Sequence, residues 1–252
     1  PEQSPDDNTT QTVTVPVSQA NVSPINDLTV SSNGTTNKLT WGVVANDKQT
    51  VTDDMESYTA FALPGDGHYL EYEYNIGPWY NFDADKEYSL DVPDYSFKFE
   101  EEAFAFITFN ADSVRADEAV TPQANTLSVF KAHSGKQFLT AFTMKQDMAM
   151  GNKVSDWLIS PMLSGDAQNI SFWYKTLNNT NGTPSFEVAY STTDSLYTSF
   201  TNVVVDTVIS MRTAEWLKMT VSLPAGTRYF AIHHTTPPNT PKTALRWCYL
   251  AI

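Results

Sequence analysis

Cysteine and basic residues are scarce in this chain of 252 residues. With a single cysteine, Cys248, no disulfide can form within the chain. Lysine and arginine number 15 against 29 acidic residues, which gives a formal net charge of −14. A sequence-independent grip on nucleic acid or on anionic lipid needs clustered cations, so the composition argues against both kinds of partner. The acidic excess favours solubility, and it also suits the binding of hard cations.

Long apolar runs and helical patterns are missing too. No stretch approaches the roughly 20 apolar residues of a membrane-spanning helix. No segment shows the 3.6-residue period of an amphipathic helix with capping residues at its ends. Hydrophobic residues still make up 41% of the chain and aromatic residues 13%, which is enough for a sizeable core. The chain opens at Pro1 without a methionine or a signal peptide, so we expect it to be a segment of something longer.

The composition divides the chain into three parts. Residues 1–25 are rich in Pro, Ser, Thr, Asn and Gln, which predicts a linker or extended segment. Residues 26–52 hold two alternating runs of β-forming residues around Asn33-Gly34, which predicts a hairpin. This hairpin resembles the first hairpin of a fibronectin type III domain, and it is either a truncated module or docked on the main domain. Residues 53–252 are expected to form that main domain.

Short strands are expected throughout the main domain. Residues 103–109 (AFAFITF) form an apolar run suited to a strand buried on both faces. Residues 156–161 (DWLISP) predict a short strand near a sheet edge, because Pro161 cannot donate to a ladder. We expect Trp157 and Trp216 to lie in the interior between two stacked sheets. Period-2 segments continue toward the C-terminus, and the predicted fold class is all-β.

Several motifs in this order also carry a resemblance to a known family. AHSG (132–135), DWLISP (156–161) and WLKMTVSLPAGTRYFAIHH (216–234) follow one another, with upstream motifs from residue 53 onward. Together they resemble the cleaved-adhesin domain, also called choice-of-anchor J, of gingipain-type haemagglutinin/adhesin proteins and other Bacteroidetes surface proteins. The resemblance covers roughly residues 53–252. It implies a jelly-roll β-sandwich, similar to galactose-binding and MAM domains, that is secreted or cell-surface and serves adhesion without catalysis.

Metal ligands are the first candidate site. Asp83-Ala84-Asp85 places two carboxylates two residues apart, so both can point the same way from an extended segment. By resemblance, this pair and Glu56 would help to hold calcium, which prefers oxygen ligands. The family's last strand often carries an acidic pair where this chain has Cys248-Tyr249. The alternative is that both aspartates cap a turn through backbone N–H groups.

A ligand-binding surface is the second candidate. Residues 69–88 are crowded with aromatic side chains interleaved with acids, a composition that suits stacking on sugars and pairing with their hydroxyl groups. The candidates for contact are Tyr72, Tyr74, Glu71 and Glu73. The alternative is that most of these rings cover the core of the sandwich with their polar tips in water.

Catalytic constellations are not evident. His233 and His234 are adjacent in a predicted strand and point to opposite faces, so they cannot chelate one metal together. Cys248 stands in an apolar segment, where a thiol is usually inert. The run Glu100-Glu101-Glu102 has no second acid at a defined spacing for glycoside hydrolysis. We therefore predict no enzyme activity.

The resulting interpretation is a non-catalytic adhesin-type module for carbohydrate or host protein, with calcium as the one possible cofactor. Its expected partners are a glycan or a host matrix protein, together with flanking domains of a longer surface protein. Two alternatives stay open. One is a structural spacer domain of such a protein, and the other is an accessory domain of a glycoside hydrolase.

Overall fold

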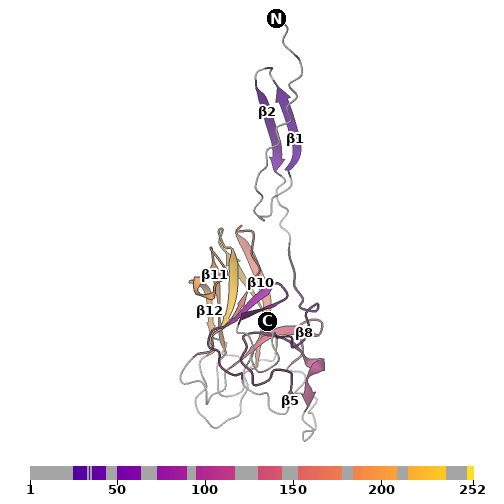
Figure 1. The fold of residues 1–252 in the computed structure, drawn as a ribbon, viewed down its shortest axis with the longest axis vertical. Helices are drawn as coiled ribbons and strands as arrows, with labels where there is room; N and C mark the ends of the chain where they lie inside the picture. Colours follow the sequence, from indigo (N-terminus) through magenta and orange to yellow (C-terminus); the bar gives the residue numbers. More distant parts are fainter. Residues whose placement is uncertain are drawn as a thin grey trace. The chain divides into compact units, whose positions relative to one another are not determined.

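A computed structural model describes the protein over residues 25–32, 34, 36–43, 50–63, 73–89, 95–116, 130–143, 153–177, 184–208, 215–236 and 249–252. The chain divides into two compact units, residues 1–51 and 52–252 (Figure 1). In the part of the chain that is described, no helix is long and apolar enough to cross a membrane.

The first unit contains a two-stranded antiparallel hairpin. Strand β1 (Ile25–Ser32) pairs with β2 (Asn37–Val43), with Val30 opposite Leu39. Gly34 lies in the connection with φ of 87°, a left-handed conformation that glycine adopts without steric cost. The predicted hairpin is thus present. Its kinship with fibronectin type III domains and its docking on the main domain stay predictions.

The second unit is a sandwich of two antiparallel sheets. The five-stranded sheet has the order β13-β10-β15-β8-β6 and the six-stranded sheet the order β12-β11-β14-β9-β4-β3, and β5 and β7 form a separate short pair. The strands are β3 (Glu73–Ile76), β4 (Trp79–Asp83), β5 (Tyr95–Ser96), β6 (Ile107–Asn110), β7 (Arg115–Ala116), β8 (Gln137–Phe142), β9 (Asp156–Ile159), β10 (Gln168–Leu177), β11 (Ser185–Ser191), β12 (Asn202–Val208), β13 (Leu217–Leu223), β14 (Tyr229–His234) and β15 (Tyr249–Ala251). Two short 3₁₀ helices, η1 (Ala111–Ser113) and η2 (Tyr197–Ser199), complete the described elements.

The order of the strands in the two sheets makes the fold a jelly roll. From β8 onward the chain passes repeatedly from one sheet to the other, so that β9, β11, β12 and β14 lie in one sheet and β8, β10, β13 and β15 in the other. The predicted all-β sandwich is confirmed. Such crossing places strands that are distant in sequence next to each other, and this is what assembles the site described below.

Phenylalanine dominates the core between the sheets. Phe109, on β6, is 1% exposed, and its ring centroid lies within 5.1–6.1 Å of five others. Those five rings belong to Phe61, Phe97, Phe130, Phe138 and Phe142. The expected strand over 103–109 is shorter than predicted, because only its last part, from Ile107, belongs to β6. Residues 103–106 are nevertheless buried, so this part of the apolar run serves mainly for packing, and Ala103 pairs with Tyr88 in an isolated bridge.

The DWLISP segment is not at a sheet edge. It forms β9, which pairs with β14 on one side and with β4 on the other, and Pro161 follows the strand. Leu158 faces the inter-sheet core, whereas Trp157 and Ile159 belong to a smaller cluster with Phe200. Trp157 is therefore buried on the outer face of the six-stranded sheet and not between the layers. Trp216 is half-buried.

Truncating Phe109 tests whether the aromatic cluster holds the sandwich together. Phe109→Ala should lower the free energy of unfolding by about 3–5 kcal/mol, because it removes a buried ring with five aromatic neighbours. The control Tyr88→Ala removes a ring that is 46% exposed and should change it by about 0.5 kcal/mol or less. Urea unfolding followed by circular dichroism measures both. Equal losses for the two variants would contradict this account of the core.

Candidate cation site

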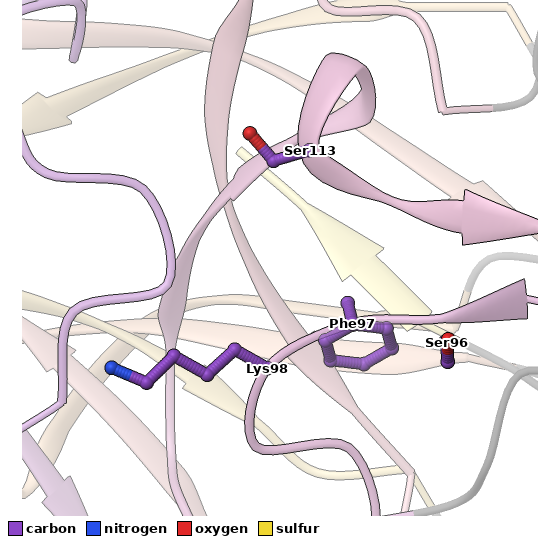
Figure 2. A pocket seen from close by; sticks show the side chains of 4 residues that line it. All are labelled: Ser96, Phe97, Lys98 and Ser113. Atoms are coloured by element: carbon purple, nitrogen blue, oxygen red, sulfur yellow. The ribbon is translucent and has the colours of Figure 1, made fainter.

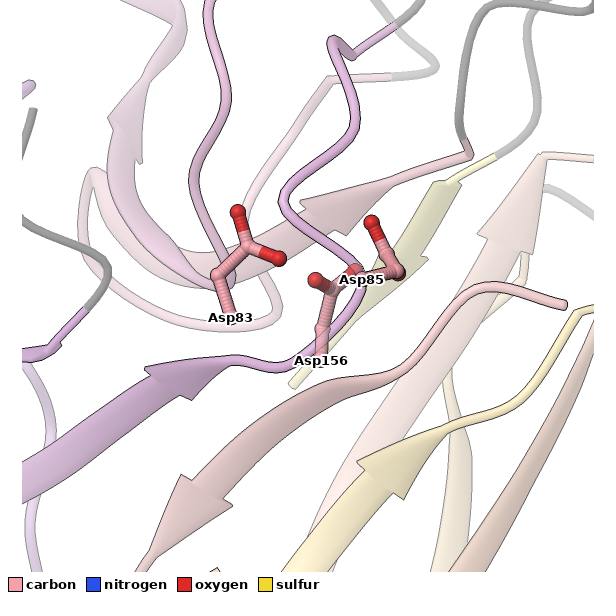
Figure 3. A group of neighbouring side chains, drawn as sticks. All are labelled: Asp83, Asp85 and Asp156. Atoms are coloured by element: carbon pink, nitrogen blue, oxygen red, sulfur yellow. The ribbon is translucent and has the colours of Figure 1, made fainter. Parts of the chain in front are cut away.

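Three aspartates meet at one end of the six-stranded sheet. Asp83 ends β4 and is the cross-strand neighbour of Asp156, which begins β9, while Asp85 lies in the turn that follows β4. One carboxylate oxygen from each residue lies within 4.8 Å of the other two (Figure 3). Asp83 is completely buried and Asp156 is 3% exposed. The predicted Asp83–Asp85 pair is thus brought together, and Asp156 is a third member that the sequence interpretation missed.

Hydrogen bonds from the protein satisfy only some of the carboxylate oxygens in this cluster. Asp83 Oδ1 accepts from the backbone N–H of Lys86 at 2.6 Å, and Asp85 Oδ1 accepts from that of Glu87 at 2.9 Å. These are turn-capping bonds of the kind the alternative interpretation expected. Asp85 Oδ2 also accepts from the backbone N–H of Ser155, which ties the turn after β4 to the residue before β9.

Burial sets the electrostatics of the cluster. Desolvation raises the pKa of Asp83 to about 7, and the neighbouring charge of Asp85 adds to the effect. Desolvation likewise raises the pKa of Asp85, and it raises that of Asp156 well above its usual range, with Asp85 and Asp83 contributing. Three carboxylates this close cannot all be ionised in a dry site without a compensating positive charge.

Unpartnered polar atoms point to the same need. Among the residues that the structure describes, Asp83 Oδ2 is buried without a hydrogen-bond partner, and so are both amide atoms of Asn81. Asn81 lies two residues before Asp83, so its side chain faces the same side of β4. Leaving a buried acceptor unsatisfied costs about 1–3 kcal/mol, and more for a charged group. Carboxylate and amide oxygens are the ligands of hard cations, and the chemistry of these residues fits Ca²⁺.

Glu56 is not a member of this cluster, which corrects the predicted ligand set. Its Oε1 accepts from the backbone N–H groups of Lys136 and Gln137, at 2.8 and 2.9 Å. A Cβ on Gly135 would lie 2.4 Å from the same oxygen, so the glycine makes room for the carboxylate. Glu56 therefore anchors the start of the domain to the AHSG turn. Cys248 lies outside the described residues.

The predicted aromatic contact surface is only partly described. Tyr74 is 5% exposed and its hydroxyl donates to the Phe106 carbonyl at 2.7 Å, so the prediction of an exposed ring was wrong. Residues of β3 alternate between exposed and buried, and Tyr74 falls on the core side. Glu73 is exposed and its Oε2 accepts from the Tyr80 hydroxyl at 2.7 Å. Tyr72 and Glu71 lie outside the described residues.

The two adjacent histidines do lie on opposite faces. On the inner face, His234 Nδ1 is 3.2 Å from Asp156 Oδ2, and its Nε2 is 2.6 Å from the Thr236 hydroxyl. Burial lowers the pKa of His234 to about 3, so the ring is neutral. With the proton of the neutral ring assigned to Nδ1, this nitrogen donates to Asp156 and Nε2 accepts from the Thr236 hydroxyl. His234 supplies a hydrogen bond to the cluster but no positive charge.

His233, on the outer face, belongs to a chain of polar groups. Its Nε2 is 3.0 Å from Ser155 Oγ and its Nδ1 is 3.1 Å from Glu187 Oε2. This order resembles a hydrolytic triad, but two features work against catalysis. Burial lowers the pKa of His233 to about 3, whereas an efficient general base has a pKa near the working pH. The indole N–H of Trp157 also donates to Ser155 Oγ at 3.2 Å, and the indole stacks on the imidazole at 3.7 Å.

Comparison with known proteins identifies the family. A sequence model of the cleaved adhesin domain matches residues 96–240, more than half of the chain. The chain belongs to the cleaved adhesin domain family. The match begins later than the expected start at residue 53, and its span includes the AHSG and DWLISP motifs and β14.

Solved structures and curated proteins were also compared. The K2 cleaved adhesin domain of Lys-gingipain is 20% identical, with a TM-score of 0.49 over 80% of this chain and 95% of that one. The K1 domain of the Porphyromonas gingivalis protein is 18% identical, with a TM-score of 0.45 over 77% of this chain and 92% of that one. A search among curated proteins finds no match. The family assignment rests on the sequence model and not on these likenesses.

A separate hollow in this cleaved adhesin domain lies beside β5. Ser96, Phe97, Lys98 and Ser113 line it (Figure 2). The Lys98 ammonium lies 4.5 Å from the ring centroid of Phe99. These four lining residues include no carboxylate and no imidazole, so the hollow offers neither the acids of the aspartate cluster nor a general base.

The neutral state of His233 has a measurable consequence for pH dependence. Its pKa is lowered from 6.5 to about 3 by burial, so below pH 6.5 the unfolded chain binds a proton that the folded chain does not. The neutral, buried His233 therefore destabilises the folded state only at low pH. Its effect on the free energy of unfolding is absent above pH 6.5 and grows as the pH falls from 6.5 toward 3. Between pH 7 and pH 5, wild type should lose about 2 kcal/mol more than His233→Gln.

Urea unfolding at both pH values measures this difference. Titrations of other groups occur in both proteins and largely cancel in the comparison. If the difference in free energy of unfolding between wild type and His233→Gln is the same at pH 7 and pH 5, His233 is not neutral and buried in the folded state.

Proposed function

We propose that this cleaved adhesin domain is a non-catalytic, secreted or cell-surface binding module that is stabilised by calcium and recognises a carbohydrate or a host protein. Family membership supports the adhesin-type role. The observation that carries the calcium part is the completely buried Asp83, which has one oxygen without a hydrogen-bond partner and lies in the cluster with Asp85 and Asp156.

Calcium is the cation that the ligand chemistry favours. Ca²⁺ takes six to eight oxygen ligands in adaptable geometry, whereas Mg²⁺ demands a near-ideal octahedron and retains water. Asp83, Asp85 and Asp156 would hold the ion, and the unpartnered amide oxygen of Asn81, on the same side of β4, is a further candidate donor. A bound divalent charge would compensate the three carboxylates and join β4, its following turn and β9. The bound cation would stabilise this end of the β-sandwich and would take no part in a reaction.

The polar chain at His233 supports the non-catalytic part of the proposal. A base with a pKa of about 3 is too weak to take the hydroxyl proton from Ser155 at neutral pH. The serine hydroxyl is also held between the indole N–H and the imidazole. This arrangement braces β9, β14 and β11 on the outer face of their sheet.

Thermal unfolding with and without calcium tests the cation site. The melting temperature of the wild type should rise with added Ca²⁺, since a ligand present at 100 times its dissociation constant adds about 2.7 kcal/mol to the stability of the folded state. Asp83→Asn and Asp156→Asn should abolish most of that rise. The control Asp166→Asn changes an exposed acid outside the cluster and should keep it. A calcium response that survives in both cluster variants would overturn the assignment.

Binding assays test the adhesin-type function directly. We expect the calcium-loaded protein to bind members of a panel of glycans and host matrix proteins, and binding should weaken in EDTA if the cation holds the domain in its active shape. No binding to any of them would remove the proposed recognition and favour the role of a structural spacer. It would leave the cation site to be judged by the melting experiment alone.

A further inference from the structure

The outer face of the five-stranded sheet presents an aromatic and basic surface near its β13 edge. On β10, Ile170, Phe172 and Tyr174 pack against the core, so the alternate residues face outward. Cross-strand pairs on this face are Asn169 with Ser222, Ser171 with Thr220, and Trp173 with Lys218. All six of these side chains are exposed. We call this set the β10–β13 face.

Trp173 is the most unusual member of this face. Its side chain is 38% exposed, although large aromatic residues normally gain stability by leaving water. The imidazole of His133 stacks on it with ring centroids 4.0 Å apart and 20° between the planes. His133 belongs to the AHSG motif, so a loop distant in sequence supports the indole on the sheet.

The loop that carries His133 is itself held in place. The Lys131 carbonyl accepts from the Trp216 indole N–H at 3.0 Å and from the Lys175 ammonium at 2.9 Å. That ammonium also lies 4.8 Å from the Trp216 ring. Because these bonds fix the loop, the Trp173 indole is presented in one orientation, which reduces the entropy lost when a ligand stacks on it.

Charge on the β10–β13 face is opposite to that of the protein as a whole. The Lys218 ammonium lies 5.9 Å from the Trp173 ring, and Lys131 is exposed on the supporting loop. Glu215, an exposed acid two residues before β13, interacts electrostatically with Lys175. In a chain of net charge −14, exposed lysines beside an exposed indole favour an anionic ligand locally.

We propose that the β10–β13 face binds an acidic polysaccharide, with Trp173 stacking on a sugar ring and Lys218 pairing with a carboxylate or sulfate group. Further polar groups along the two strands would pair with sugar hydroxyls. They are the hydroxyl groups of Ser171 and Thr220, and the Ser222 hydroxyl, which donates to Asn169 Oδ1 at 2.7 Å. An exposed face with a row of small polar groups suits an extended glycan better than a peptide side chain, which needs a pocket. This inference rests on the proposed adhesin-type function and names its ligand class.

Affinity measurements on the full chain test the proposal, with heparin and polygalacturonate as acidic probes and dextran as the neutral probe. Wild type should bind the acidic probes in preference to dextran, and added salt should weaken that binding. Trp173→Ala should weaken it by about tenfold or more, as expected for a central aromatic contact. Lys218→Gln should weaken it severalfold and reduce the dependence on salt.

Matched controls separate this face from the rest of the surface. Tyr88→Ala removes another exposed ring and Lys98→Gln another exposed cation, and both should bind like wild type. Unchanged melting temperatures of Lys218→Gln and Trp173→Ala exclude loss of folding as the cause.

Three results would overturn the inference. Wild-type affinity in both face variants would place the glycan elsewhere and leave the adhesin-type function standing. Preference for dextran, or binding only to proteins on the wider panel, would reject the ligand class but not the function. Absence of binding to every probe and every panel member would reject both.

Discussion

Three carboxylates packed into a dry corner are the constraint on which one end of this domain depends. Asp83 and Asp156 are cross-strand neighbours, and Asp85 returns from the following turn to bind the backbone before β9. Like charges opposite each other on a sheet are destabilising, and burial makes the repulsion stronger. The arrangement makes physical sense when a cation or protons supply the missing positive charge.

The aspartate cluster has both polar and apolar neighbours, which satisfy part of its hydrogen bonding and exclude water from it. His234 contributes a hydrogen bond to Asp156 and is held from behind by the Thr236 hydroxyl. Tyr74 on β3 and Leu158 on β9, the two strands that flank β4, face the inter-sheet core. The cluster is therefore continuous with the core of the sandwich, and binding of an ion there would act on the stability of the whole layer rather than on one loop.

The proposed recognition surface and the aspartate cluster lie on different faces of the sandwich. The inner face of the six-stranded sheet carries the aspartates, and its outer face carries Trp157 stacked on His233 and covered by Phe200. The five-stranded sheet instead leaves its outer face open around Trp173. A domain of this kind would use an exposed surface whose Trp173 ring is held by His133, which is consistent with a non-catalytic binding module.

Period and composition were sufficient to predict much of the fold. The alternating segments, the apolar run that ends in β6 and the missing helical patterns predicted an all-β chain. The ordered motifs predicted, by resemblance, the family and its jelly-roll sandwich. Asp83 and Asp85 were recognisable because they are two residues apart. The same reasoning was wrong for Tyr74 and for the position of β9, because the number of exposed aromatic rings and the neighbours of a strand depend on how the sheets assemble.

What the sequence by itself determined is thus local: where strands form, which residues alternate along them, and that no disulfide can stabilise the chain. Tertiary structure alone decided that Asp156 joins the aspartate pair, that Glu56 binds the AHSG turn instead, and that His133 supports Trp173. Each of these contacts joins residues 40 or more positions apart, as in the pairing of Asp83 with Asp156. Their partners are set by strand register and by the crossing of the chain between two sheets, and neither leaves a periodic signal in the sequence.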